Sequence, residues 1–166
     1  PICITIVDDP LRKCGLGSRP FDGEGVRQTR RKVIDKGVLQ TWLLSTSDAM
    51  QLGLQSTGHA SRGINTPPYP SPSNLYMEPG SVTPAELMRD IRHGVYLTNV
   101  YGSGIDIITG DVSLGAAGFL IENGEITVPV AGITIAGNLR DMFRNVAAAN
   151  DLVFRYGTDA PTLRID

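Results

Sequence analysis

The chain is poor in the side chains that bind transition metals. Its 166 residues include two cysteines, Cys3 and Cys14, and two histidines, His59 and His93. Two cysteines are too few for a disulfide framework, which favours a reducing compartment such as the cytoplasm. A hydrolytic zinc site needs three protein ligands, usually with two histidines about four residues apart on one helix. The sequence therefore predicts no metal site of its own.

Charge of one sign and long apolar runs are also scarce. The formal net charge is −2, which excludes the strongly basic surface of a dedicated nucleic-acid-binding domain. The apolar runs are shorter than the about 18 residues of a membrane-spanning helix. One basic stretch, residues 27–32, is interpreted as a solvated edge strand, with a contact for an acidic partner surface as the alternative. We expect neither a membrane nor nucleic acid as a direct partner.

Turn-forming residues are abundant, with 19 glycines and 11 prolines. The apolar spacing has period two, which predicts a mainly antiparallel α+β domain over residues 1–166 with about three short helices. One hairpin joins residues 32–34 to 38–44. A second joins residues 118–121 to 126–128 through Asn123-Gly124, a strong signal for a two-residue turn. Pro129 lacks the N–H of a strand ladder, so the second arm belongs on a sheet edge.

Three short helices are expected. Thr83 and Glu86 are spaced as a capping box, and Gly94 is suited to the C-terminal cap of the helix that they start. The expected helices cover residues 84–93, a segment that follows Asn138, and residues 48–52.

The chain has one long segment without a predicted element, residues 55–73. Four prolines lie in it among serine, threonine and glycine. At 19 residues it exceeds most loops inside compact domains, so it is either a mobile connector or a functional loop. The β-type run at residues 2–7 follows Pro1 directly, which predicts that the chain begins inside a longer protein that also has an N-terminal domain.

Two carboxylates stand beside glycines at Phe21-Asp22-Gly23-Glu24-Gly25. Calcium binding or acid–base work is one interpretation of this run. The spacing matches no EF-hand loop, and solvated turn carboxylates are the alternative. A self-contained hydrolase that uses Asp22 or Glu24 therefore stays open as a hypothesis.

Five blocks of the sequence resemble the C-terminal domain of the TldD/PmbA family, the metallopeptidase-related proteins also called modulators of DNA gyrase. The blocks are residues 17–25, 52–60, 73–80, 112–124 and 133–139. The chain is more similar to the PmbA (TldE) branch, because TldD-type subunits have a cysteine metal ligand near the C-terminus. The corresponding stretch here, residues 156–163, contains no cysteine.

The resemblance implies an intracellular, cytoplasmic heterodimer that acts on unfolded peptides. The TldD-like partner subunit would hold zinc, while this chain would have no cofactor and no catalytic residue and would supply a wall of the substrate cleft and a subunit interface. Phe21, Asp22, Gly23, Glu24 and Gly25 would be a family signature, and Ser56, Thr57, Gly58 and His59 would contact substrate.

Two further expectations concern how the chain binds other molecules. An extended peptide could add its backbone hydrogen bonds to an exposed sheet edge. We also expect the isolated chain to expose an apolar face where the N-terminal part that precedes it in the longer protein would pack, with self-association of the chain as one consequence. The alternative to a peptidase component is a pure protein-interaction module without peptide chemistry.

Overall fold

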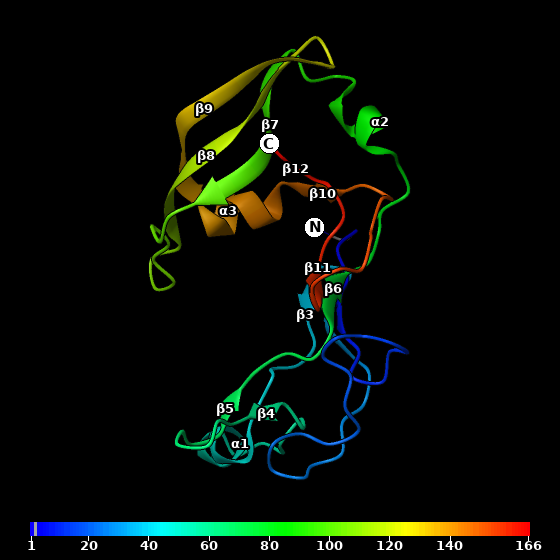
Figure 1. The fold of residues 1–166 in the computed structure, drawn as a ribbon, viewed down its shortest axis with the longest axis vertical. Coiled ribbons are helices and arrows are strands. Elements are labelled where there is room, and N and C mark those ends of the chain that lie inside the picture. The colour runs from blue at the N-terminus through cyan, green and yellow to red at the C-terminus, as the bar shows by residue number, and fades with distance from the viewer. Residues whose placement is uncertain (2) are drawn as a thin grey trace. The chain divides into compact units, whose positions relative to one another are not determined.

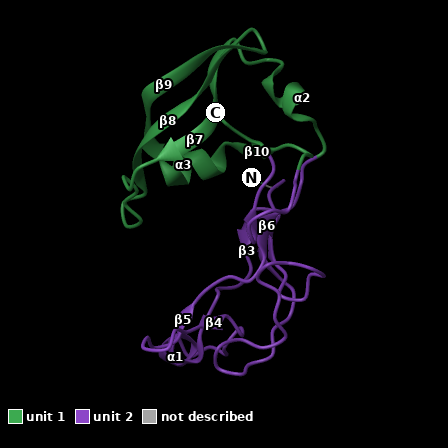
Figure 2. Ribbon diagram, in the orientation of Figure 1, with its two compact units in different colours: residues 1, 81–151, 162–166 green, residues 2–80, 152–161 purple. Residues whose placement is uncertain are grey.

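The computed structural model describes Pro1 and residues 3–166, and the contacts gather in two compact units (Figure 2). Unit 1 comprises Pro1, Ser81–Asp151 and Thr162–Asp166, and unit 2 comprises Ile2–Gly80 and Leu152–Pro161. The expectation of one domain over residues 1–166 stays a prediction. The β-type run expected from Ile2 starts outside the described residues, and the strand in that region begins at Ile6.

Unit 2 is built around a five-stranded sheet in which all neighbours but one pair are antiparallel (Figure 1). Its order is β11 (Thr158–Asp159), β6 (Leu75–Met77), β1 (Ile6–Asp8), β2 (Arg31–Asp35) and β3 (Val38–Leu39). The first hairpin is confirmed as β2 and β3, which turn at Lys36 and Gly37, but its second arm ends at Leu39 and not at residue 44 as predicted. Lys36 and Gly37 both have the positive φ of a primed turn, 49° and 78°.

The interpretation of residues 27–32 as an edge strand is wrong. The strand β2 includes only the last two of these residues, and it lies between β1 and β3. Arg30 instead makes exposed ion pairs with Asp9 and Glu78, at 3.7 and 3.4 Å. Local charge could not reveal this, because the position of a strand in its sheet depends on distant partners.

The remainder of unit 2 holds α1 (Thr46–Gln51), β4 (Ala60–Ser61) and β5 (Tyr69–Pro70). The short helix expected at residues 48–52 exists and starts two residues earlier. Ser45 is its N-cap and accepts a hydrogen bond from the backbone N–H of Asp48 at 3.2 Å.

Unit 1 contains an antiparallel sheet of β7 (His93–Tyr101), β8 (Asp111–Glu122) and β9 (Glu125–Asn138). The second hairpin is confirmed, and its arms are longer than predicted. Asn123 and Gly124 form the turn with φ of 52° and 83°. Pro129 lies in β9, which is an edge strand as expected.

The other elements of unit 1 are α2 (Pro84–Met88), α3 (Leu139–Arg144), β10 (Val146–Ala148) and β12 (Leu163–Ile165). The capping box of Thr83 and Glu86 is present, and Asn138 caps α3. The prediction that α2 continues to His93 is wrong. His93 opens β7, and Gly94 pairs with Ile121 rather than capping a helix, because pairing with β8 overrides local helix signals.

Over the residues that the structure describes, the fold is therefore a mainly antiparallel α+β arrangement with three short helices, as the sequence predicts. The described residues include no helix that is long and apolar enough to cross a bilayer.

Candidate functional site

The two ends of the long segment 55–73, which we call its base, bind to strand β1 through a polar network centred on Asp8 and His59. The side chains of both residues are fully buried. Nε2 of His59 lies 2.9 Å from Oδ2 of Asp8. Ser73 donates its backbone N–H to Oδ1 of Asp8 at 2.7 Å and its hydroxyl to Oδ2 at 2.6 Å. One carboxylate therefore joins strand β1 to both ends of the segment.

The second ring nitrogen of His59 is also occupied. Nδ1 lies 2.9 Å from the hydroxyl oxygen of Thr57. That hydroxyl oxygen accepts the backbone N–H of Leu44 at 2.7 Å, and it lies 3.3 Å from the carbonyl oxygen of Leu44. A neutral His59 that donates from Nε2 to Asp8 can accept the Thr57 proton at Nδ1. A protonated His59 can donate from Nδ1 to the hydroxyl oxygen of Thr57, and the Thr57 hydroxyl then donates to the carbonyl oxygen of Leu44. Both charge states of the imidazole are therefore satisfied.

The carboxylate of Asp8 is stabilised in its charged form. Burial alone would raise the pKa of Asp8, but the hydrogen bonds from His59 and Ser73 outweigh it and hold the pKa below the ordinary value of 3.8. The buried network is therefore built around a negative charge.

This charge predicts a specific loss of stability in acid. Because the pKa of Asp8 is lower in the folded than in the unfolded chain, its stabilisation is complete above the unfolded pKa and is lost as pH falls through the folded pKa. Urea unfolding from pH 7 down to about pH 2.5 measures this loss. We expect the wild-type free energy of unfolding to fall more steeply below about pH 4 than that of Asp8→Asn. Parallel curves for the two proteins would contradict this assignment.

Further bonds hold both ends of the segment. The side-chain amide of Gln28 donates to the carbonyl oxygen of Gly58, and the N–H of Ser71 donates to the carbonyl oxygen of His59 at 2.8 Å. Asn74 accepts the N–H of Gly17 at 2.9 Å. Both ends of the segment are therefore tied to the rest of unit 2 by hydrogen bonds.

The two carboxylates of the 21–25 run have structural partners. Asp22 is buried and accepts three backbone N–H groups, from Glu24 at 2.9 Å, Val26 at 2.8 Å and Ala60 at 3.0 Å. Glu24 accepts the N–H of Thr46 at 2.8 Å. Both oxygens of Asp22 are thus occupied, so neither a calcium ligand nor a solvated turn carboxylate describes it. Asp22 is a buried cap that joins the 21–25 turn to β4.

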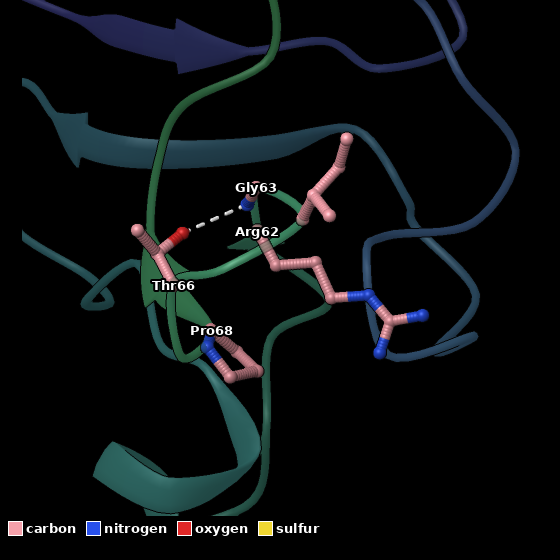
Figure 3. Close-up of a pocket in the computed structure, with 5 residues that line it drawn as sticks. Arg62, Gly63, Thr66 and Pro68 are labelled. Atoms are coloured by element: carbon pink, nitrogen blue, oxygen red, sulfur yellow. Dashed lines mark hydrogen bonds between the residues drawn. The ribbon is translucent and has the colours of Figure 1, made fainter.

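The tip of the segment is exposed and bears a surface pocket of about 620 Å³ (Figure 3). The residues that line it are Arg62, Gly63, Ile64, Thr66 and Pro68. Thr66 accepts the N–H of Gly63 at 2.9 Å, which closes the loop and leaves its hydroxyl proton available. Arg62 has no ion-pair partner within the described part of the chain. The pocket can therefore offer polar donors and an apolar wall to a bound group.

The structure places the expected substrate-contacting residues in the base rather than at the tip. Thr57, Gly58 and His59 are buried, while Ser56 is half-buried. Their role in substrate contact stays a prediction. The sequence analysis did not identify Arg62 and Thr66. The available signal was a cationic and a hydroxyl side chain close to Gly63 in a proline-rich loop.

The donor set does not fit a hydrolytic zinc ion. His59 uses both ring nitrogens in the buried network, and His93 lies in unit 1. Cys3 and Cys14 are exposed thiols. Among the residues that the structure describes, no group of three or more histidine, cysteine or acidic side chains is placed to hold a metal ion.

Comparison with known proteins identifies related sequences. Residues 2–166 match the profile of the PmbA/TldA metallopeptidase C-terminal domain. The metalloprotease PmbA of Escherichia coli O157:H7 is 45% identical over 156 residues, which are 93% of this chain and 33% of that protein. A PmbA homologue of Haemophilus influenzae is 43% identical and covers 100% of this chain and 35% of its own length. The chain thus spans about a third of these relatives.

Solved structures share the fold. A proposed modulator of DNA gyrase from Thermotoga maritima superposes with a TM-score of 0.85 at 36% identity, covering 98% of this chain and 38% of that one. TldE from Thermococcus kodakarensis has a TM-score of 0.87 at 22% identity, covering 99% of this chain and 38% of that one, and shows the fold alone.

Proposed function

This chain belongs to the PmbA/TldA metallopeptidase C-terminal domain family, and from that membership we propose that it is the non-metal-binding, PmbA/TldE-like part of a metallopeptidase complex. The complex acts on unfolded peptides in the cytoplasm. A TldD-like partner subunit holds the zinc, and this chain supplies one wall of the substrate cleft and a subunit interface.

The observation that carries the proposal is the hydrogen bonding of both ring nitrogens of His59. An imidazole becomes a zinc ligand through a free ring nitrogen. Both nitrogens of His59 are engaged, with Asp8 and Thr57, inside a fully buried network. Releasing either nitrogen would leave a buried polar group without a partner, at a cost of about 1–3 kcal/mol. The geometry therefore favours a structural histidine in a subunit that assists the chemistry.

The tip of segment 55–73, residues 62–68, supports the proposal that this chain supplies a wall of the substrate cleft. It is an exposed loop on a fixed base, so a peptide could bind it without first ordering the protein, which lowers the entropic cost of binding. Arg62 and the hydroxyl of Thr66 can donate hydrogen bonds to peptide carbonyl or carboxylate groups. Ile64 and Pro68 offer apolar contact on the same pocket.

Reconstitution tests the proposal. We expect the full-length protein to cleave an unfolded peptide only when a TldD-like partner is added, and a chelator to abolish the cleavage. Hydrogen exchange of the complex should show added protection at residues 61–70 when peptide is bound. Cleavage by this chain alone, or unchanged exchange at the tip in a complex that binds peptide, would contradict the proposal. Arg62→Ala should weaken peptide binding, and Arg27→Ala, another exposed arginine of unit 2, is the matched control.

A pure interaction module is the second candidate. The observation that favours it is the number of large apolar side chains that unit 1 leaves more than a third exposed, among them Val100, Phe143 and Ile165. Lasting binding to a partner protein without any chelator-sensitive cleavage would identify this function instead.

A further inference from the structure

The pocket at the tip carries one charged side chain among the residues that line it, Arg62. The other lining residues, Gly63, Ile64, Thr66 and Pro68, are uncharged. Figure 3 shows the Arg62 side chain extending away from Thr66, so the guanidinium and the Thr66 hydroxyl address different parts of a bound group. The volume of about 620 Å³ lies within the range of small-ligand sites. The pocket therefore has a single positive pole.

The stem of Arg62 is held against the 21–25 turn. A Cβ at Gly23 would lie 3.4 Å from Cγ of Arg62 and 3.1 Å from the carbonyl oxygen of Ala60. The backbone N–H of Gly23 donates to that same carbonyl oxygen at 2.7 Å. Because the turn is bonded to β4 at Ala60, the start of the Arg62 side chain has a defined place two residues further along. The guanidinium then loses less conformational freedom when it binds a ligand.

The two carboxylates beside Gly23 leave the charge of Arg62 without a counterion. Asp22 is buried, and both of its oxygens accept backbone N–H groups. Glu24 accepts the N–H of Thr46 at 2.8 Å. Arg62 forms no ion pair with any residue that the structure describes. A guanidinium whose neighbouring acids are engaged elsewhere is available to a ligand.

We propose that Arg62 makes this pocket selective for a peptide carboxylate, which is either an acidic side chain or the C-terminal carboxylate. A planar guanidinium can donate two parallel N–H bonds to a carboxylate, a pairing that a neutral amide does not reproduce. The apolar wall of Ile64 and Pro68 contacts the carbon chain that bears the acid. The inference rests on the proposed role of this chain as a wall of a peptide cleft, and it adds the chemical class of peptide that the wall prefers.

Equilibrium binding of matched peptides tests the proposal. The full-length protein would be mixed with a TldD-like partner, with the zinc removed by a chelator so that the peptides stay intact. Fluorescence anisotropy would compare labelled unfolded peptides that carry Glu, Gln or Lys at one position, and a second pair that differs only in a free or an amidated C-terminus. We expect the acidic member of at least one pair to bind about fivefold more tightly than its neutral counterpart at about 50 mM salt. The difference should shrink at about 1 M salt, because exposed charges are screened.

Three substitutions of Arg62 separate its charge from its structural role. Arg62→Ala should bind acidic and neutral peptides equally, Arg62→Lys should keep part of the preference, and Arg62→Glu should favour the lysine peptide. Arg27→Ala, which changes another exposed arginine of unit 2, is the matched control and should keep the wild-type preference. With zinc restored, the preference should appear in KM and not in kcat, since a contact made equally in the ground and transition states changes only binding.

The results separate this inference from the proposed function. Equal binding of acidic and neutral peptides, or a preference that survives in Arg62→Ala, would overturn the inference. Equal binding is also the result expected if another part of the full-length protein pairs with Arg62. Cleavage without any such preference would overturn the inference alone. A preference that depends on Arg62 in a complex that cleaves no peptide would support the inference and contradict the proposed function. A complex that binds no peptide at all would contradict both.

Discussion

Replacing Asp8 with alanine should lower the free energy of unfolding of unit 2 by about 4 kcal/mol. The substitution removes the one acceptor of three buried donors, which are Nε2–H of His59 and the N–H and hydroxyl of Ser73. Buried donors without partners carry their full desolvation cost. Thermal and urea unfolding measure the loss, and a decrease of about 12 °C in the melting temperature corresponds to it.

Asp9→Ala is the matched control, because Asp9 is the adjacent carboxylate and only partly buried. Its ion pair with Arg30 is long, at 3.7 Å, so its loss should cost less than about 1 kcal/mol. The double variant Asp8→Ala with His59→Ala should be less destabilised than the sum of the single variants, since the two side chains share one bond. Equal costs for Asp8→Ala and Asp9→Ala would show that the network does not fix the segment.

Replacing Gly17 with alanine should lower the free energy of unfolding by about 3 kcal/mol because of a steric clash. A Cβ at Gly17 would overlap the backbone carbonyl of Ser73. That carbonyl cannot move away easily, because Ser73 is bonded to Asp8 through both its N–H and its hydroxyl. The measurement is again the free energy of unfolding, and local hydrogen exchange at residues 71–75 should rise.

Gly53→Ala separates this effect from the general cost of replacing glycine. Gly53 has a φ of 65° and open space where a Cβ would stand. Its substitution should cost only the left-handed backbone strain, about 1 kcal/mol. If Gly17→Ala is no worse than Gly53→Ala, the approach of residue 17 to Ser73 is not as close as the structure places it.

The features that the sequence predicted correctly are encoded by neighbouring residues. The Asn123-Gly124 turn, the capping box of Thr83 and Glu86 and the N-cap at Asn138 each depend on residues less than four positions apart. Their physical causes are local sterics and local hydrogen bonds, so a short window of sequence suffices.

The features that the sequence did not predict depend on distant residues. Asp8 bonds His59 across 51 positions and Ser73 across 65 positions, and no local pattern reports such pairs. The end of α2 at Met88 has the same cause, since the following residues pair with β8 instead of extending the helix. The same long-range pairing buries the side chain of His59, which lies in a segment without local core signals.

Metal analysis of the separated subunits shows which of them binds zinc. The full-length protein and a TldD-like partner would be purified apart, loaded with zinc, dialysed and measured by mass spectrometry. We expect bound zinc in the partner and none in this chain, with the zinc content of the mixed complex equal to that of the partner alone. One equivalent of zinc held by this chain and lost in His59→Ala would instead show that this chain binds the metal through His59.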